Sequence, residues 1–239
     1  MIAFLITSVI LNEFYIENTG IRFLNRFLEI DIFALFFVCL CFLFIINGSN
    51  LIDGYNGLLS IHTLIILINL FFVNYFGGNN DLAFFIFCVI LVITIFLKYN
   101  FPKATLFLGD SGSYFLGTFI AISVIKTSIA NPTISPFYFC ILLFYLFFEV
   151  FFSFIRKITA KNSSPLFPDK EHLHMLLYKI FLKKNNDKLK SNYYVSIVIN
   201  LIYLILIIPA IFMMNNGMFC KYYSIVFFLI YLFSYKIAY

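Results

Sequence analysis

The sequence predicts an all-α, polytopic integral membrane protein. Of its 239 residues, 63% are hydrophobic, only 11% are charged and 35 are Phe. A typical soluble domain is closer to half apolar and a quarter charged, so most of this chain must face lipid rather than water. Long apolar runs separated by polar connections support the same prediction, because about 20 helical residues cross the hydrocarbon layer.

The apolar runs define the expected helices in order. They lie near 1–11, 32–46, 57–76, 82–97, 113–130, 136–155, 193–212 and 219–235. The shorter internal runs reach spanning length with their flanks, whereas the first run is too short to span. We therefore expect about seven full transmembrane helices and a truncated first one, within a single membrane domain over residues 1–239.

The basic residues predict the topology. Since each crossing changes sides, the connections at 47–56, 98–112 and 156–192 share one face. These connections and the C-terminal Lys236 contain twelve of the 16 Lys and Arg residues. The positive-inside rule makes this face cytoplasmic, with 156–192 as a basic cytoplasmic loop. The net charge of +5 therefore reflects membrane topology, and we expect no nucleic-acid partner.

Two polar loops on that face each contain an aspartate beside an apolar helix. Asp53 lies in NGSNLIDGYNGL (47–58) and Asp110 in FLGDSGSYFLG (107–117). Helix N-termini attract anions, so carboxylates there suit a site in which Mg²⁺ lies between them and a phosphate. The alternative is that both aspartates only cap helices. Glycines that let the backbone approach a ligand flank both loops, at Gly54, Gly57, Gly109 and Gly112.

Four further polar residues lie in or beside the apolar runs. His172 and His174, in PDKEHLHMLL, are two residues apart and do not share a helix face, which argues against a helical zinc pair. They suit phosphate binding, with an ordinary hydrated loop as the alternative. Glu149 is a carboxylate late in the 136–155 run, for which we expect an orienting or structural role. His62 either faces the site or packs between helices.

Together the three loops resemble the polyprenyl-phosphate N-acetylhexosamine-1-phosphate transferase family (glycosyltransferase family 4 type), which is related to phospho-MurNAc-pentapeptide translocase. Each motif alone is weak evidence for this family. The three motifs in this order, on one face of the membrane, are specific evidence for it. The matching residues are Asn47, Asn50, Asp53, Gly54, Gly57, Leu58, Gly109, Asp110, Gly112, Ser113, Asp169, His172 and His174.

The resemblance implies an enzyme of the bacterial inner membrane with its active site on the cytoplasmic face. It would transfer N-acetylhexosamine-1-phosphate from a UDP-N-acetyl amino sugar to polyprenyl (undecaprenyl) phosphate and release UMP. This reaction would start a cell-envelope polysaccharide such as O-antigen. The expected cofactor is Mg²⁺, with Mn²⁺ as an alternative, and a homodimer is left open.

The resemblance also implies roles for individual residues. The catalytic set would be Asp53, Asp110, His172 and His174, with Asp110 and Asp53 holding the metal. The substrate-binding set would be Asn47, Asn50, Gly54, Asn56, Gly57, Gly109, Ser111, Gly112, Ser113, Arg156 and Asp169.

The sequence departs from the family pattern at three places. Met175 replaces a third imidazole, and Asn56 stands where many relatives have a second Asp. No Asp-Asp pair precedes residue 47, so we expect the N-terminal third of a typical member to be absent. The competing hypothesis is a non-catalytic relative that binds nucleotide-sugar or lipid without turnover. A transporter is less suitable, because its polar residues should line breaks at the membrane midplane.

Overall fold

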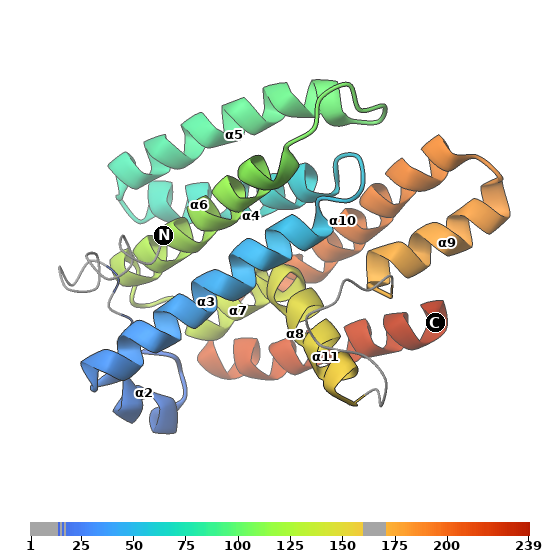
Figure 1. Ribbon diagram of the computed structural model, residues 1–239. Coiled ribbons are helices and arrows are strands. Elements are labelled where there is room, and N and C mark those ends of the chain that lie inside the picture. The colour runs from blue at the N-terminus through green and yellow to red at the C-terminus, as the bar shows by residue number, and fades with distance from the viewer. Residues whose placement is uncertain (1–13, 15, 17, 160–170) are drawn as a thin grey trace.

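The computed structural model describes Phe14, Ile16 and residues 18–159 and 171–239, and every regular element in these residues is a helix (Figure 1). Six of the described helices are long and apolar enough to span a membrane, as the sequence predicts. The first apolar run lies outside the described residues. The six helices are α3 (Asp31–Ile52), α4 (Leu58–Phe76), α5 (Asn80–Asn100), α6 (Gly109–Ala130), α10 (Lys188–Phe212) and α11 (Gly217–Ala238).

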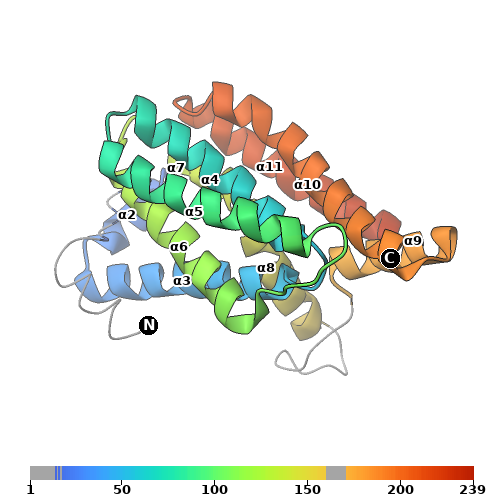
Figure 2. The ribbon, with the colours of Figure 1, turned by 90° about the horizontal axis from the view of Figure 1, so that it is seen from above.

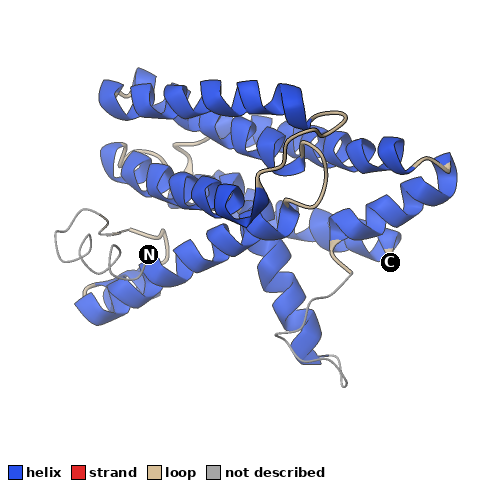
Figure 3. Cartoon of the chain, turned by 45° about the horizontal axis from the view of Figure 1, so that its top comes forward, coloured by secondary structure: helices blue, strands red, loops and turns tan. Residues whose placement is uncertain are grey.

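Two further apolar helices are joined at a sharp bend and count as a seventh span only if the pair is taken together. The 136–155 run, expected to form one helix, is divided into α7 (Pro136–Leu142) and α8 (Phe144–Thr159), which meet at 74°. Leu143 leaves the helical conformation between them, with φ −97° and ψ 2°. Figure 3 shows the C-terminal end of α8 projecting out of the helix bundle. The prediction of one continuous helix here is therefore wrong.

The connections also contain two shorter helices. The segment before the first described span forms α2 (Arg22–Leu28), and the basic 156–192 loop contains α9 (Leu173–Asn185). α9 packs beside α10 and α11, so the described part of this loop is folded against the helix bundle.

The helices divide into a packed centre and a lipid-facing periphery. α3 packs against α6 and α8, while α4 packs against α5, α6 and α10 (Figures 1 and 2). On the peripheral helices large apolar side chains stay exposed, as Phe84 and Phe85 do on α5 and Phe233 on α11. Such continuous apolar surface is expected where lipid is the solvent.

Small residues bring α3 very close to two neighbouring helices. A Cβ on Gly117 of α6 would lie 2.9 Å from the Cα of Ile46 and 2.8 Å from Oγ of Ser49. A Cβ on Gly48 of α3 would lie 2.1 Å from the carbonyl oxygen of Leu146 in α8. Small residues at helix interfaces allow this approach in membranes. They fix the starts of α6 and α8 against the C-terminal half of α3.

Candidate functional site

The connections that carry the polar motifs meet at one end of the helix bundle (Figure 1). The backbone N–H of Asn56 donates to Oδ1 of Asn192 at 2.8 Å, and its side-chain amide donates to the carbonyl of Pro102 at 2.9 Å. The backbone N–H of Gly57 donates to Oδ1 of Asn100 at 2.8 Å. The α3–α4 connection is thereby fixed to the end of α5 and the start of α10.

Asn50 joins the first polar loop to the second. Its side-chain amide donates to Oδ1 of Asp110 at 2.9 Å and to Oγ of Ser113 at 3.1 Å. The Ser113 hydroxyl in turn donates to the backbone carbonyl of Asp110 at 3.1 Å. Asp110 lies exposed in the first turn of α6, where the N–H groups of a helix N-terminus attract anions.

Neither aspartate caps a helix N-terminus, so the capping alternative does not hold. Asp53 follows the last residue of α3, and α4 begins later with Gly57 at its N-cap. Asp110 lies inside α6, whose N-cap position is Leu108. The expectation that Asp53 lies at a helix N-terminus is also wrong, because its carboxylate is at the C-terminal, negative end of α3.

The two aspartates are electrostatically coupled. Burial raises the pKa of the Asp53 carboxyl to about 7, and the nearby negative charge of Asp110 adds to this increase. Within the part of the chain that the structure describes, no cluster of three or more His, Cys, Asp or Glu side chains could hold a metal ion. Two carboxylates nevertheless suit Mg²⁺, which often keeps one or two carboxylate ligands and completes its shell with water and phosphate.

The third motif surrounds Glu149 of α8. Nδ1 of His172 lies 3.1 Å from Oε2 of Glu149, and Nδ1 of His174 lies 3.7 Å from Oε1. The Tyr145 hydroxyl is 3.5 Å from the same nitrogen of His174. Glu149 and both histidines are buried, so the interpretation of HLH as an ordinary hydrated loop is wrong.

Tyr55 connects this cluster with the aspartate loops. Its ring lies edge-on to His174, with the ring centroids 5.7 Å apart, and 5.3 Å from the ring of Tyr178 on α9. Sequence reasoning did not select Tyr55. The available signal was an aromatic residue between Asp53 and Asn56, in a loop otherwise made of small and polar residues.

Arg156 holds the end of α8 against α9 and α11. Its guanidinium donates to the carbonyl of Glu171 and to the hydroxyl of Tyr235, and it lies 3.7 Å from the Glu171 carboxylate. Glu149 therefore contacts the two histidines, whereas Arg156 pairs with the residue that precedes them.

Of the remaining predicted residues, all but Asp169 lie in the described part of the chain. Asn47 is exposed and its amide donates back to Leu43 of its own helix at 2.7 Å. Gly54, Gly109 and Ser111 are exposed at the mouth, and Gly112 packs against Leu108. Asp169 lies outside the described residues.

His62 belongs to the helix packing. Its Nδ1 lies 3.1 Å from Oδ1 of Asn200, and its ring centroid is 4.3 Å from that of Tyr203. The side chain is fully buried. Of the two interpretations left open by the sequence, packing between helices is therefore the correct one.

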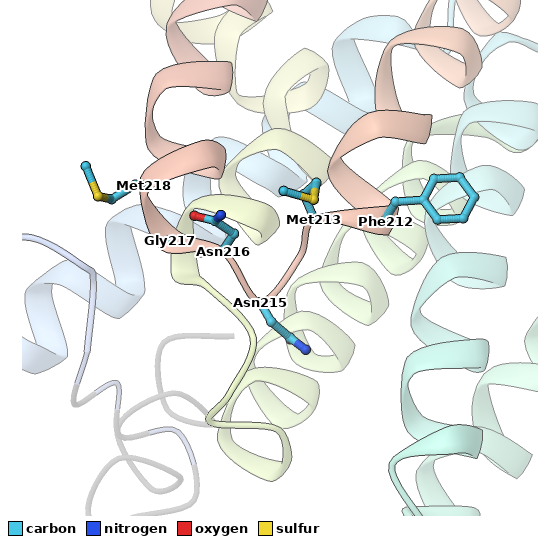
Figure 4. Close-up of a pocket in the computed structure, with 6 residues that line it drawn as sticks. All are labelled: Phe212, Met213, Asn215, Asn216, Gly217 and Met218. Atoms are coloured by element: carbon cyan, nitrogen blue, oxygen red, sulfur yellow. The ribbon is translucent and has the colours of Figure 1, made fainter.

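A shallow hollow at the α10–α11 turn does not extend this site. Figure 4 shows that its side chains, among them Phe212, Asn215 and Met218, point in different directions. It lies at the far end of α10 from Asn192, roughly 30 Å along a helix that rises about 1.5 Å per residue.

Comparison with known proteins identifies the family. Residues 1–128 match the family model described as glycosyl transferase family 4. The chain belongs to glycosyl transferase family 4. This match covers both aspartate loops of the family 4 chain and ends before the histidine motif, and it confirms the resemblance seen in the sequence.

Three curated relatives are similar to this family 4 chain over part of its length. It is 32% identical over 152 residues to the undecaprenyl-phosphate α-N-acetylglucosaminyl 1-phosphate transferase of Thermotoga maritima, covering 62% of the chain and 45% of the relative. It is 33% identical over 175 residues to a probable undecaprenyl-phosphate N-acetylglucosaminyl 1-phosphate transferase of Bacillus subtilis, covering 66% and 46%. With the phospho-N-acetylmuramoyl-pentapeptide-transferase of Clostridium novyi it shares 34% over 123 residues, covering 49% and 38%. The chain thus spans less than half the length of these relatives.

Proposed function

We propose that the chain transfers N-acetylhexosamine-1-phosphate from a UDP-amino sugar to polyprenyl phosphate. An oxygen of the lipid phosphate attacks the sugar-linked phosphorus of the donor. The bond from that phosphorus to the bridging oxygen breaks, and UMP leaves with the bridging oxygen. The observation that carries this proposal is the hydrogen bond from Asn50, about one turn before Asp53 at the end of α3, to Asp110 in the first turn of α6, which brings the two aspartate loops to one place.

The residues at the mouth suit the binding of a diphosphate. Asp110 and Asp53 would hold a divalent cation, while the first turn of α6 offers backbone N–H groups to a phosphate oxygen. Asn50 fixes the Asp110 carboxylate through its amide. A bound Mg²⁺ would neutralise phosphate charge, and phosphoryl transfer depends chiefly on such neutralisation and on positioning.

Two substrates of opposite solubility fit a site at a membrane surface. A lipid phosphate reaches the mouth from the bilayer, since the connection just before α6 exposes apolar side chains such as Leu106 and Phe107 near Asp110. A nucleotide-sugar reaches it from water. The distribution of basic residues supports the cytoplasm as the aqueous side. The names of two relatives, which are undecaprenyl-phosphate N-acetylglucosaminyl 1-phosphate transferases, support this lipid acceptor and this class of sugar.

The test is turnover by the purified chain in lipid nanodiscs with undecaprenyl phosphate and Mg²⁺. UDP-GlcNAc, UDP-GalNAc and UDP-MurNAc-pentapeptide are supplied separately, and UMP and the lipid-linked sugar are both quantified. We expect equal amounts of the two products from one of the amino-sugar donors, with none when either substrate or the divalent cation is omitted. Absence of product with every donor would contradict the proposal.

Calorimetry with the same donors distinguishes the proposed transferase from the competing hypothesis of a non-catalytic relative. A non-catalytic relative would bind a UDP-sugar or the lipid phosphate without releasing UMP. Binding that is lost in Asp110→Asn, together with no turnover in the wild-type chain, would favour that alternative.

A further inference from the structure

The buried cluster of Glu149, His172 and His174 has no part in holding the cation or the α6 phosphate site described above. Glu149 and His174 are fully buried and His172 is 4% exposed. A carboxylate buried in a membrane helix is expensive and marks a functional position by default. The arrangement of the three side chains indicates what that function is.

The hydrogen bond between Glu149 and His172 fixes the orientation of one imidazole. An ionised carboxylate can only accept, so Nδ1 of His172 donates to Oε2 of Glu149 across 3.1 Å. Because a histidine held through one ring nitrogen offers the other one to a ligand, carboxylates commonly set the tautomer of functional histidines. Nε2 of His172 therefore faces away from Glu149.

The ring of His174 has the same orientation toward Glu149 as the ring of His172. Its Nδ1 faces both Oε1 of Glu149, at 3.7 Å, and the hydroxyl of Tyr145, at 3.5 Å. Its ring is parallel to that of His172, with an interplanar angle of 5° and a centroid separation of 5.4 Å. Its Nε2 is buried and has no hydrogen-bond partner among the described residues. A buried polar atom without a partner needs an explanation, and a ligand that completes its hydrogen bonding is one.

The fold holds the carboxylate in place from both sides. Gly48 lets the backbone of α8 rest on α3 at Leu146, one turn before Glu149. At the other end Arg156 donates to the carbonyl of Glu171, immediately before His172. Tyr55, in the loop of Asp53, lies edge-on to His174. The histidines are thus oriented by Glu149 beside the loop that carries one of the two aspartates.

We propose that Glu149 is a positioning residue that holds His172 and His174 on their Nδ1 sides, so that the Nε2 atom of His174 binds a phosphate of the substrate. This inference rests on the proposed function for the identity of that phosphate. The contact between Glu149 and the histidines does not depend on it, so the two can be tested separately.

The first test is ¹⁵N NMR of the full chain in micelles with labelled histidine. The sequence has only three histidines, and His62 is an internal control because its Nδ1 faces Asn200 instead. In the wild type we expect the proton of His172 and of His174 on Nδ1. Glu149→Gln should change the ring ¹⁵N shifts of these two residues and leave His62 unchanged. Unchanged shifts of both residues in Glu149→Gln, or a wild-type proton on Nε2, would overturn the proposal.

Titration with inorganic pyrophosphate and Mg²⁺ in the same samples tests the phosphate contact without turnover. We expect the Nε2 resonance of His174 to move in the wild type and to move less in Glu149→Gln. If Glu149→Gln does not fold, Glu149→Asp replaces it, since it keeps the charge but shortens the reach. No movement of the Nε2 resonance of His174 in the wild type, at concentrations that saturate binding, would overturn the phosphate contact.

The second test is a mutant cycle on UMP release. Glu149→Gln should lower kcat about 10- to 100-fold with little change in KM for the UDP-sugar. In a His172→Ala/His174→Ala background the same change should cost less than about twofold, because residues that act through one another are non-additive. An equal loss in both backgrounds would show a merely structural role. If the wild type releases no UMP, the proposed function fails, and the two NMR measurements still decide the role of Glu149.

Discussion

Asn50 and Asp110 lie 60 residues apart in the sequence and are joined by a hydrogen bond of 2.9 Å between α3 and the first turn of α6. The bond is possible because Gly117 lets the two helices pack closely. It orients a carboxylate that is otherwise exposed at the mouth of the site. The amide of Asn50 therefore determines where Asp110 points.

Replacing Asn50 should slow the reaction without unfolding the protein. A hydrogen bond to a charged group contributes about 1.5–3 kcal/mol, which corresponds to roughly a 10- to 100-fold change in rate. We expect Asn50→Ala to lower kcat/KM for UMP release by this factor. The matched control is Asn69→Ala, since the Asn69 amide donates to the carbonyl of Ile65 within its own helix, α4. Equal rates for the two variants would contradict the role of Asn50.

The raised pKa of Asp53 predicts a pH-dependent stability. The ordinary value is 3.8 and the value in the metal-free fold is about 7. Between these values the folded protein retains a proton that the unfolded chain has lost, so stability falls as the pH rises from about 4 to about 7. Asp53→Asn should therefore raise the thermal unfolding temperature of the metal-free protein at pH 8 and change it little at pH 4.

Divalent cations should reverse this difference. At pH 8 we expect Mg²⁺ or Mn²⁺ to raise the unfolding temperature of the wild type and to have little effect on Asp53→Asn. A wild type that is as stable as Asp53→Asn without metal at pH 8 would contradict the raised pKa of the Asp53 carboxyl. Comparison of the two ions also shows which one the site prefers.

Gly57 is predicted to tolerate no side chain. Its φ is +76°, and a Cβ would lie 2.6 Å from a ring carbon of Phe101 and 3.2 Å from Ile61. Gly78 is the matched control, with φ +80° and no described atom within 4 Å of an added Cβ. Gly78→Ala should cost about 1–2 kcal/mol of backbone strain. Gly57→Ala should cost more, because the contact with Phe101 adds to the strain. Chemical denaturation in micelles measures both, and equal losses would rule out the contact.

Gly48 is predicted to control the position of α8. An added Cβ would overlap the Leu146 carbonyl, so Gly48→Ala should push α8 away from α3 and displace Glu149. We expect a lower unfolding temperature and altered ¹⁵N shifts of His172 and His174. Gly217→Ala is the control, since its Cβ would meet only Ser135 at an ordinary distance of 3.8 Å. Unchanged histidine shifts in Gly48→Ala would show that α8 is held by other contacts.

The sequence was sufficient to predict the spans and the meeting of the aspartate loops. Apolar run length is a local property, and it places the bounds of α3, α4, α5, α6, α10 and α11 within six residues of the observed ones. Loops on one face of a membrane protein must lie at one end of its bundle, so sidedness alone predicted that the loops of Asp53 and Asp110 would be close.

The bend at Leu143 and the pairing of Glu149 could not be predicted in this way. The segment FCILLFYLFFE contains no Pro or Gly to mark a break, and the bend accompanies the packing of α8 against α3. The contact between Glu149 and His172 joins residues 23 apart in sequence. It depends on where α8 and α9 meet, which residue spacing does not specify.

The most direct test of the account compares UMP release by Asp110→Asn with release by Asp81→Asn. Both aspartates are exposed in the first turn of a spanning helix, but the first turn of α5, which contains Asp81, follows the end of α4 that is remote from the site. We predict that Asp81→Asn keeps the wild-type rate and that Asp110→Asn loses at least about 100-fold, as expected when a ligand to a charge-neutralising metal is removed. Retention of the wild-type rate by Asp110→Asn would contradict the central claim that Asp110 holds the phosphate-binding cation.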